Sequence, residues 1–114
     1  MTERLLRAPS LYRVVKHNGI AYIGGIVADD DSQDMGGQTR EVLAKLDTYL
    51  KEAKSDRSKL LSATIFITDM NVKPDMDAAW KEWFAPDELP ARATIGVADL
   101  GERTLIELIA TAHY

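Results

Sequence analysis

The sequence predicts one α+β domain, residues 1–114, in which a mixed β-sheet carries two helices on one face. Three observations lead to this fold class: an Asn-Gly pair between two strand-like runs, two segments with apolar residues at helical spacing, and the β-branched runs around those segments. The predicted order is β-β-α-β-α-β-β. Because a strand precedes and follows each helix, the crossovers can place both helices on the same face of the sheet.

The first two strands form a predicted hairpin. Residues 12–17 and 20–23 have strand character, and Asn18-Gly19 separates them. This pair is typical of a type I′ turn, because both central positions of that turn need a positive φ. Gly24-Gly25 is expected to close the second strand, and residues 1–10 mix charged and small side chains, which indicates an irregular or edge segment.

The middle of the chain alternates helix and strand. From Met35 to Ala53 the apolar residues lie at helical spacing, with charged residues on the other side. Leu60–Thr68 is a nearly continuous apolar run, typical of a central strand covered on both faces. A second helix follows Asp69, and its apolar residues form one stripe that indicates core packing rather than a ligand platform: Met76, Ala79, Trp80, Trp83 and Phe84.

The last part of the chain is predicted to be another hairpin. The runs 91–98 and 104–112 have strand character, and the polar segment 99–103 between them has hairpin length. Each run contains one charged residue, Arg92 in the first and Glu107 in the second. A charge among strand aliphatics is costly to bury alone, so each side chain must be exposed, paired or used by the protein.

A symmetric register about this connection would place Arg92 opposite Thr111 and Glu107 opposite Gly96. The two charges would then share a face but stand about 13 Å apart along the strands. A small ligand does not bridge that distance within one chain. If both charges served one small ligand, as the family resemblance described below implies, Arg92 of one subunit meeting Glu107 of a neighbouring subunit would be one solution, and this is a hypothesis that assumes the register.

The number of layers also predicts an oligomer. Two helices can cover one face of the sheet, whereas the other face still carries Ile, Val and Leu side chains. Association of identical chains through that bare face is the usual remedy, so we expect that the protein is not a monomer.

Composition excludes several classes of function. A net charge of −4 argues against nucleic acid as a partner, since phosphate binding relies on basic patches. No apolar run has membrane-spanning or signal-peptide character. The chain has no cysteine, which excludes a thiol nucleophile and is compatible with a cytoplasmic location. His17 and His113 have no neighbouring metal-ligand pattern, so we expect no metal.

From about residue 12 nearly the whole chain resembles the Rid family, the reactive intermediate deaminases also called the RidA/YjgF or L-PSP family, and two segments carry most of the resemblance. Residues 90–100, PARATIGVADL, resemble the family signature P-A-R-[SAT]-x-[VI]-x-V-x-x-L, and residues 105–110 are similar to the closing strand, in which a glutamate lies among aliphatics. The resemblance implies a chorismate mutase-like fold assembled as a homotrimer, with an inner barrel of three sheets, outer helices and ligand clefts between subunits. It also implies hydrolysis of 2-imino acids to 2-oxo acids and ammonia without a metal or organic cofactor.

By this resemblance, three residues would contribute side chains to the cleft. Arg92 would bind the substrate carboxylate, which suits a guanidinium fork. Glu107 would orient and activate the attacking water. Tyr12 would place a hydroxyl at the edge of the cleft. Without the resemblance, Arg92 would be a surface arginine, Glu107 a glutamate paired with another charge, and Tyr12 a half-buried strand-end tyrosine.

Three further positions belong to the implied substrate site. Thr94 and Gly25 would contribute mainly backbone N–H groups to the ligand carboxylate. Gly24 stands where many imine-hydrolysing members have serine, so one hydroxyl contact is missing. A larger or differently shaped imine or enamine fits this glycine better.

Two alternative functions stay open. The first is a non-catalytic trimer that binds small carboxylates or another protein, which the change at Gly24 favours. The second is an endoribonuclease or translation inhibitor, an activity attached to relatives by name, which the acidic charge and the lack of a histidine pair oppose.

Overall fold

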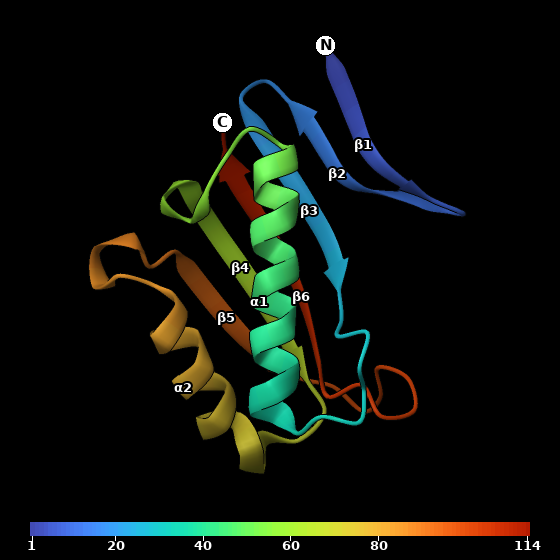
Figure 1. Ribbon diagram of the computed structural model, residues 1–114, viewed down its shortest axis with the longest axis vertical. Helices are drawn as coiled ribbons and strands as arrows, with labels where there is room; N and C mark the ends of the chain where they lie inside the picture. The colour runs from blue at the N-terminus through green and yellow to red at the C-terminus, as the bar shows by residue number, and fades with distance from the viewer.

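The computed structural model describes residues 1–114 as a six-stranded sheet with two α-helices packed on one face (Figure 1). The strands are β1 (Thr2–Ala8), β2 (Leu11–His17), β3 (Ile20–Ile26), β4 (Leu60–Ile67), β5 (Ala91–Gly96) and β6 (Ile106–His113). The helices are α1 (Met35–Glu52) and α2 (Lys73–Trp83). The α+β class and the placement of both helices on one face are confirmed.

The strands are ordered β1-β2-β3-β6-β4-β5 across the sheet. The pairs β1–β2, β2–β3, β3–β6 and β4–β6 are antiparallel, and β4–β5 is parallel. The last strand of the chain therefore lies in the middle of the sheet, between β3 and β4. β1 and β5 form the two edges.

The N-terminal segment supplies one strand more than the predicted order contains. Residues 2–8 pair with β2 as an edge strand, so the edge interpretation of residues 1–10 is confirmed and the irregular one is wrong. The first hairpin is as predicted, since Asn18 and Gly19 have φ values of 51° and 84°. β3, however, continues through the Gly24-Gly25 pair to Ile26 instead of ending there.

The predicted hairpin of residues 91–98 and 104–112 is wrong. β5 pairs with β4 in parallel and makes no ladder with β6, which pairs with β3 and β4 instead. Residues 99–103 are a crossing connection that carries the chain past β4. The physical reason is that β4 lies between the two strands, and a sequence pattern of strand, polar loop and strand does not reveal a strand inserted from elsewhere.

The hydrophobic core lies between the sheet and the two helices. β4 alternates buried residues at Ala63, Ile65 and Ile67 with partly exposed residues between them, so only its helix-facing side is covered within the chain. This differs from the expected cover on both faces. The helix side chains that complete the core include Val42, Leu43, Leu46, Leu50, Met76 and Trp80.

The other face of the sheet, called the open face below, is bare within the chain. Apolar side chains stand exposed on it, among them Tyr22 at 52%, Ile95 at 44% and Ile109 at 40%. This is the bare face that layer counting predicted. Neither helix is long and apolar enough to cross a membrane.

Candidate functional site

The Gly24-Gly25 pair forms a bulge in β3 beside Glu107. The ladder between β3 and β6 shifts register between Ile23 and Ile26, so the two glycines sit in the irregular step. Gly25 has a φ of +67°, and a Cβ built there would lie 3.4 Å from Oε2 of Glu107. A bulge re-aims the backbone locally, and here it brings the Gly25 main chain against the Glu107 carboxylate.

Glu107 points to the open face. Its neighbours in β6, Ile106 and Leu108, are both 1% exposed and belong to the core, and side chains alternate between faces along a strand. The start of β6 is fixed by Gln38 of α1, a fully buried side chain. Its amide nitrogen donates to the Arg103 carbonyl at 2.9 Å, and its amide oxygen accepts from the Leu105 N–H at 2.9 Å. Gln38 therefore holds the chain just before the segment that carries Glu107.

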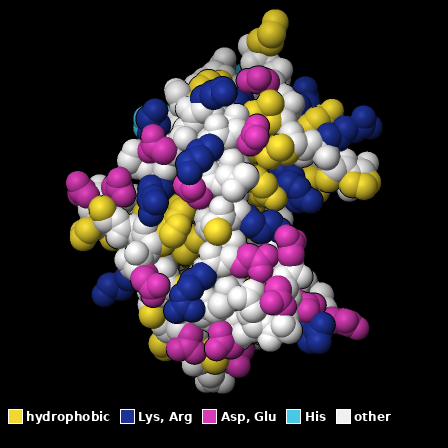
Figure 2. Space-filling model, viewed as in Figure 1, with side chains coloured by type: hydrophobic (Ala, Val, Ile, Leu, Met, Phe, Trp, Pro, Cys, Tyr) yellow, Lys and Arg dark blue, Asp and Glu magenta, His cyan; other side chains and the backbone are white.

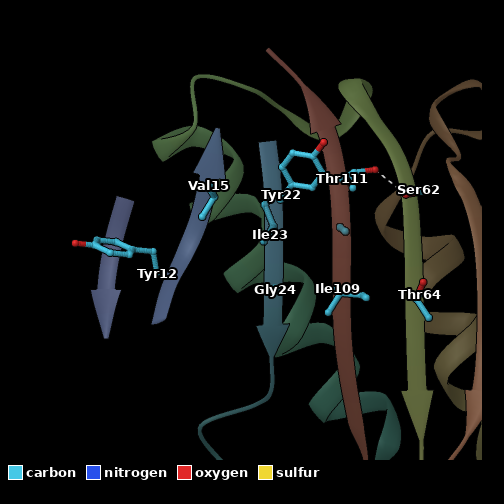
Figure 3. Close-up of a pocket in the computed structure, with 10 residues that line it drawn as sticks. Tyr12, Val15, Tyr22, Ile23, Gly24, Ser62, Thr64, Ile109 and Thr111 are labelled. Carbon is cyan, nitrogen blue, oxygen red and sulfur yellow. Dashed lines mark hydrogen bonds between the residues drawn. The ribbon is translucent and has the colours of Figure 1, made fainter. Parts of the chain in front are cut away.

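A hollow of about 360 Å³ opens on the same face, next to the bulge (Figure 3). Figure 3 shows its residues on four neighbouring strands, β2, β3, β6 and β4, with the hydroxyls of Ser62 and Thr111 hydrogen-bonded to each other at 2.6 Å. None of the residues that line it is charged: Tyr12, Val15, Tyr22, Ile23, Gly24, Ser62, Thr64, Ile109, Ala110 and Thr111. The hollow therefore suits an uncharged, mainly apolar group.

Arg92 lies on the opposite side of the sheet, against α2. It pairs with Ala63, which is 3% exposed and faces the helices. Its Nη2 donates to Oδ1 of Asp77 at 2.8 Å, and the guanidinium carbon lies 5.3 Å from the centre of the Trp80 ring. The Arg92 side chain is 23% exposed, so part of the guanidinium is accessible at the edge of the molecule.

Asp77 also binds Lys73 through Oδ2 at 2.7 Å, so the three side chains form one charged chain with a net positive charge. Burial alone would raise the pKa of the Asp77 carboxyl, but hydrogen bonds from Lys73 and Arg92 outweigh burial and hold the pKa below its ordinary value of 3.8. Asp77 therefore stays ionised at neutral pH, and the guanidinium is oriented by a carboxylate of its own chain.

The structure does not bring Arg92 and Glu107 together within one chain. Glu107 pairs with Phe66 and Arg92 pairs with Ala63, three residues away along β4, so the two side chains point to opposite faces. Three residues along the strand and two strand spacings across give roughly 14 Å between their Cα positions. The predicted shared face and the pairings with Thr111 and Gly96 are wrong, because they assumed the β5–β6 hairpin. The separation itself is similar to the predicted one.

The remaining predicted residues lie partly on the open face of the sheet and partly on the face that the helices cover. Tyr12 is at the end of the hollow, on β2, and its hydroxyl points away from Ile109 and Thr111 in Figure 3. Gly24 lines the hollow. Thr94 follows Arg92 on the same side of β5, since it pairs with the fully buried Ile65, and its hydroxyl oxygen is buried without a hydrogen-bond partner.

Sequence reasoning assigned no site role to Asp77, Gln38 or Tyr22. The signal for Asp77 was present in the spacing of Lys73 and Asp77, four residues apart on a helix, which predicts an ion pair. The contact with Arg92 needs the parallel β4–β5 pairing, which the sequence pattern did not reveal. Tyr22 could be found only by knowing which face of β3 is open.

Superposition on solved structures shows the class of protein to which this fold belongs. A structure of an uncharacterised protein from Pseudomonas aeruginosa superposes with a TM-score of 0.94 at 31% identity, covering 99% of this chain and 98% of that one. A member of the YjgF protein family from Neisseria meningitidis superposes with a TM-score of 0.94 at 28% identity, covering 99% of this chain and 94% of that one. The chain thus has the YjgF fold.

The sequence comparison identifies the family. The model of the family described as Endoribonuclease L-PSP matches residues 1–114. A RutC family protein from Haemophilus ducreyi is 38% identical over 99 residues, covering 87% of this chain and 85% of that protein. The chain belongs to this family, the Rid or YjgF family, and the resemblance seen in residues 90–100 and 105–110 is confirmed.

The name of a further relative states an activity. A protein from Acinetobacter baylyi named 3-aminoacrylate deaminase RutC is 30% identical over 104 residues, covering 86% of this chain and 82% of that protein. The family thus includes a protein named as a deaminase of a small enamine acid.

Proposed function

We propose that the protein is a homotrimeric hydrolase that deaminates enamine and imine intermediates, 2-imino acids above all, to 2-oxo acids and ammonia. The reaction would take place in a cleft between subunits, without a metal or organic cofactor, and in the cytoplasm. The family membership and the relative named 3-aminoacrylate deaminase support the reaction class.

The observation that carries the proposal is the placement of the two charges. Arg92 offers a partly exposed guanidinium at the β5 edge, and Glu107 offers a carboxylate on the open face beside the bulge. Hydrolysis of an imino acid needs a cation that binds its carboxylate and a base that activates water. Arg92 and Glu107 would supply these two groups, but within one chain they lie on opposite faces of the sheet. A neighbouring chain that brings its β5 edge to the open face would complete the site.

The chemistry follows from these two groups. The guanidinium of Arg92 would hold the substrate carboxylate, and the backbone N–H groups of Thr94 in the same chain and of Gly25 in the chain that supplies Glu107 would add hydrogen bonds to it. Glu107 would accept a proton from a water molecule as its oxygen bonds to the imine carbon. That proton passes to the nitrogen to give a carbinolamine. Its hydroxyl proton then moves to the amino group as the C–N bond breaks and the C=O bond forms, so that C=N and water become C=O and NH₃. An enamine enters the same path after a proton moves to its carbon.

The apolar face supports the oligomer. Exposed Tyr22, Ile95 and Ile109 lie on the side of the sheet that no helix covers, and apolar surface of this kind is normally buried against another chain. Three chains around a common axis would bury the three open faces together.

A non-catalytic carboxylate-binding trimer is the second candidate. Gly24 provides no side-chain hydroxyl for the chemistry, and Arg92 is oriented by Asp77 as a cation, so the structure would also suit a protein that binds an anion without turnover. An endoribonuclease is not favoured, because acidic side chains gather over the loops that follow β3 and precede β6 (Figure 2), and an acidic surface repels RNA.

Ammonia release from freshly generated 2-iminobutanoate and 2-iminopropanoate tests the proposal. The wild-type protein should accelerate release over the spontaneous rate, and Arg92→Ala should lower kcat/KM about 100-fold, since losing hydrogen bonds to a charged group costs about 3 kcal/mol. Arg40→Ala, at an exposed ion pair with Glu82, is the matched control and should leave kcat/KM unchanged. Wild-type protein that binds 2-oxobutanoate but accelerates no imine would favour the second candidate.

A further inference from the structure

Lys73 shares a carboxylate with Arg92. Its Nζ donates to Oδ2 of Asp77 at 2.7 Å, and Nη2 of Arg92 donates to Oδ1 of the same group at 2.8 Å. Because one carboxylate bridges the two cations, the ammonium lies within about 8 Å of the guanidinium. These contacts join the start of α2 to β5, which lies beside it (Figure 1).

The stability of α2 does not explain a lysine at position 73. The N-terminal end of a helix carries a partial positive charge, so a cation in its first turn is unfavourable. An ion pair four residues apart is also weaker when the cation precedes the acid. Lys73 is the first residue of α2, and Asp77 follows it by four residues, so the pair departs from both rules. Departures of this kind are typical of residues that serve a site.

The charges of the three side chains determine what an approaching anion meets. Burial opposes ionisation of Asp77, but hydrogen bonds from Lys73 and Arg92 outweigh burial and hold the pKa of the carboxyl below its ordinary value. The charges of Arg92 and Asp77 alone would cancel, so a carboxylate near the guanidinium would be attracted by one and repelled by the other. The ammonium of Lys73 leaves the three side chains with one net positive charge.

The guanidinium of Arg92 is held in place but keeps free donors. Asp77 accepts from Nη2, Sδ of Met76 lies 4.0 Å from Nη1, and the centre of the Trp80 ring lies 5.3 Å from the guanidinium carbon. A guanidinium has five N–H donors in one plane, so several remain for a planar carboxylate. The side chains of Arg92, Asp77 and Lys73 are 23%, 33% and 36% exposed. Their charges are therefore partly screened by water but still act across several ångströms.

We infer that Lys73 is a second cation of the substrate-carboxylate site, and that it offsets the charge of Asp77 so that Asp77 can orient Arg92 without weakening its attraction for an anion. The inference rests on the proposed function, in which Arg92 binds the substrate carboxylate. Lys73 acts through Asp77 and touches no reacting atom. It therefore determines how tightly the substrate binds and not how fast the chemical step proceeds.

Lys73→Met tests this role, since it removes the charge and keeps most of the apolar stem. Calorimetry with 2-oxobutanoate at low ionic strength gives Kd, and ammonia release from 2-iminobutanoate gives KM and kcat. We expect Kd and KM to rise about three- to tenfold, the effect of one unit charge about 8 Å away in a partly hydrated site, with kcat changed less than about twofold. Lys73→Arg keeps the charge and should stay within about twofold of the wild type in all three.

The double variant Lys73→Met/Asp77→Asn separates charge from shape. Asparagine keeps a carbonyl oxygen that accepts from Arg92 but has no charge, so the net charge is again positive. Affinity for 2-oxobutanoate should return to within about twofold of the wild type. Lys51→Met is the matched control: Lys51 pairs with Asp47 at 2.8 Å, also four residues apart, on α1. This control removes the same charge from the protein and should leave Kd and KM unchanged.

The outcomes distinguish this inference from the proposed function. A Lys73→Met variant that binds 2-oxobutanoate as well as Lys51→Met does, or a double variant that binds it no better than Lys73→Met, overturns the inference. The deaminase function then stands if the wild type still accelerates ammonia release. Weaker binding in Lys73→Met that the double variant restores, in a protein without turnover, supports the inference and overturns the deaminase function.

Discussion

Arg92 and Glu107 differ in the contacts that their side chains make within one chain. Arg92 has a carboxylate partner, an aromatic neighbour and partial cover from α2. Glu107 stands on the open face with the Gly25 main chain beside it. The resemblance found in the sequence could indicate both residues, but only the structure shows that one is oriented by Asp77 while the other faces the uncovered side of the sheet.

Glu107→Gln tests the role of the carboxylate in moving protons. The amide has nearly the same shape, so contact with Gly25 and substrate binding should be retained, whereas proton acceptance is lost. We expect kcat to fall by about 10²- to 10⁴-fold, the usual contribution of a general base, with KM changed less than about threefold. Steady-state ammonia release checks this, and a large rise in KM with unchanged kcat would contradict it.

Asp77→Asn tests the ion pair with Arg92 through the pH dependence of stability. The folded-state pKa of Asp77 is lowered, so the ionised carboxylate adds to the free energy of unfolding. This contribution is fully present above the ordinary pKa of 3.8 and is lost as the pH falls through the folded-state pKa. The pair is about one-third exposed, so we expect the wild type to exceed the variant by less than about 1 kcal/mol at pH 7. Urea unfolding should show this difference shrink and vanish as the pH falls below 3.8 and through the folded-state pKa, and a difference that grows in acid would contradict the pairing.

At the scale of elements, the sequence predicted most of the regular structure and failed on one connection. The first hairpin, both helices and the β4 run were predictable because Asn18-Gly19, the helical stripes and the β-branched run at Leu60–Thr68 are local signals. The pairing of β5 with β4 is non-local. A parallel pair leaves no turn between its strands for a pattern to reveal, so the site register that depended on it was wrong.

The β3 bulge gives a matched pair of substitutions. Gly25→Ala places a Cβ at a φ of +67°, which costs about 1–2 kcal/mol of unfolding free energy. Gly24→Ala places one in open space at an ordinary φ and should change stability by less than about 0.5 kcal/mol. Urea unfolding of both variants compares them directly, and equal losses would show that the bulge does not depend on the left-handed residue.

Gln38 links α1 to the start of β6. Gln38→Ala would leave the Leu105 N–H and the Arg103 carbonyl without their partners, and we expect a loss of about 2–4 kcal/mol in unfolding free energy. Activity should fall as well, since the segment leading to Glu107 loses its anchor. Gln33→Ala is the control: its amide bonds to Asp30 and Glu41 at the surface, and its loss should stay below about 1 kcal/mol. Similar losses in the two variants would argue against a special role for Gln38.

At the scale of the whole molecule, the open face is the feature that a single chain leaves unfinished. Layer counting could predict it, because two helices cannot cover both faces of the sheet. The positions of the hollow and of Gly24 on that face could not be predicted, since they depend on the order β3-β6-β4 in the middle of the sheet. The proposed trimer and the shared site both depend on what this face meets in the assembled protein.

The most direct test is to mix two inactive variants, Arg92→Ala and Glu107→Gln, in equal amounts, unfold them together and refold them. If each site takes Arg92 from one chain and Glu107 from its neighbour, random assembly gives an intact site at about a quarter of the interfaces. Activity should then recover to about a quarter of the wild-type value, and each variant refolded alone should stay inactive. Mixed oligomers that form but remain as inactive as the single variants would contradict a site shared between chains.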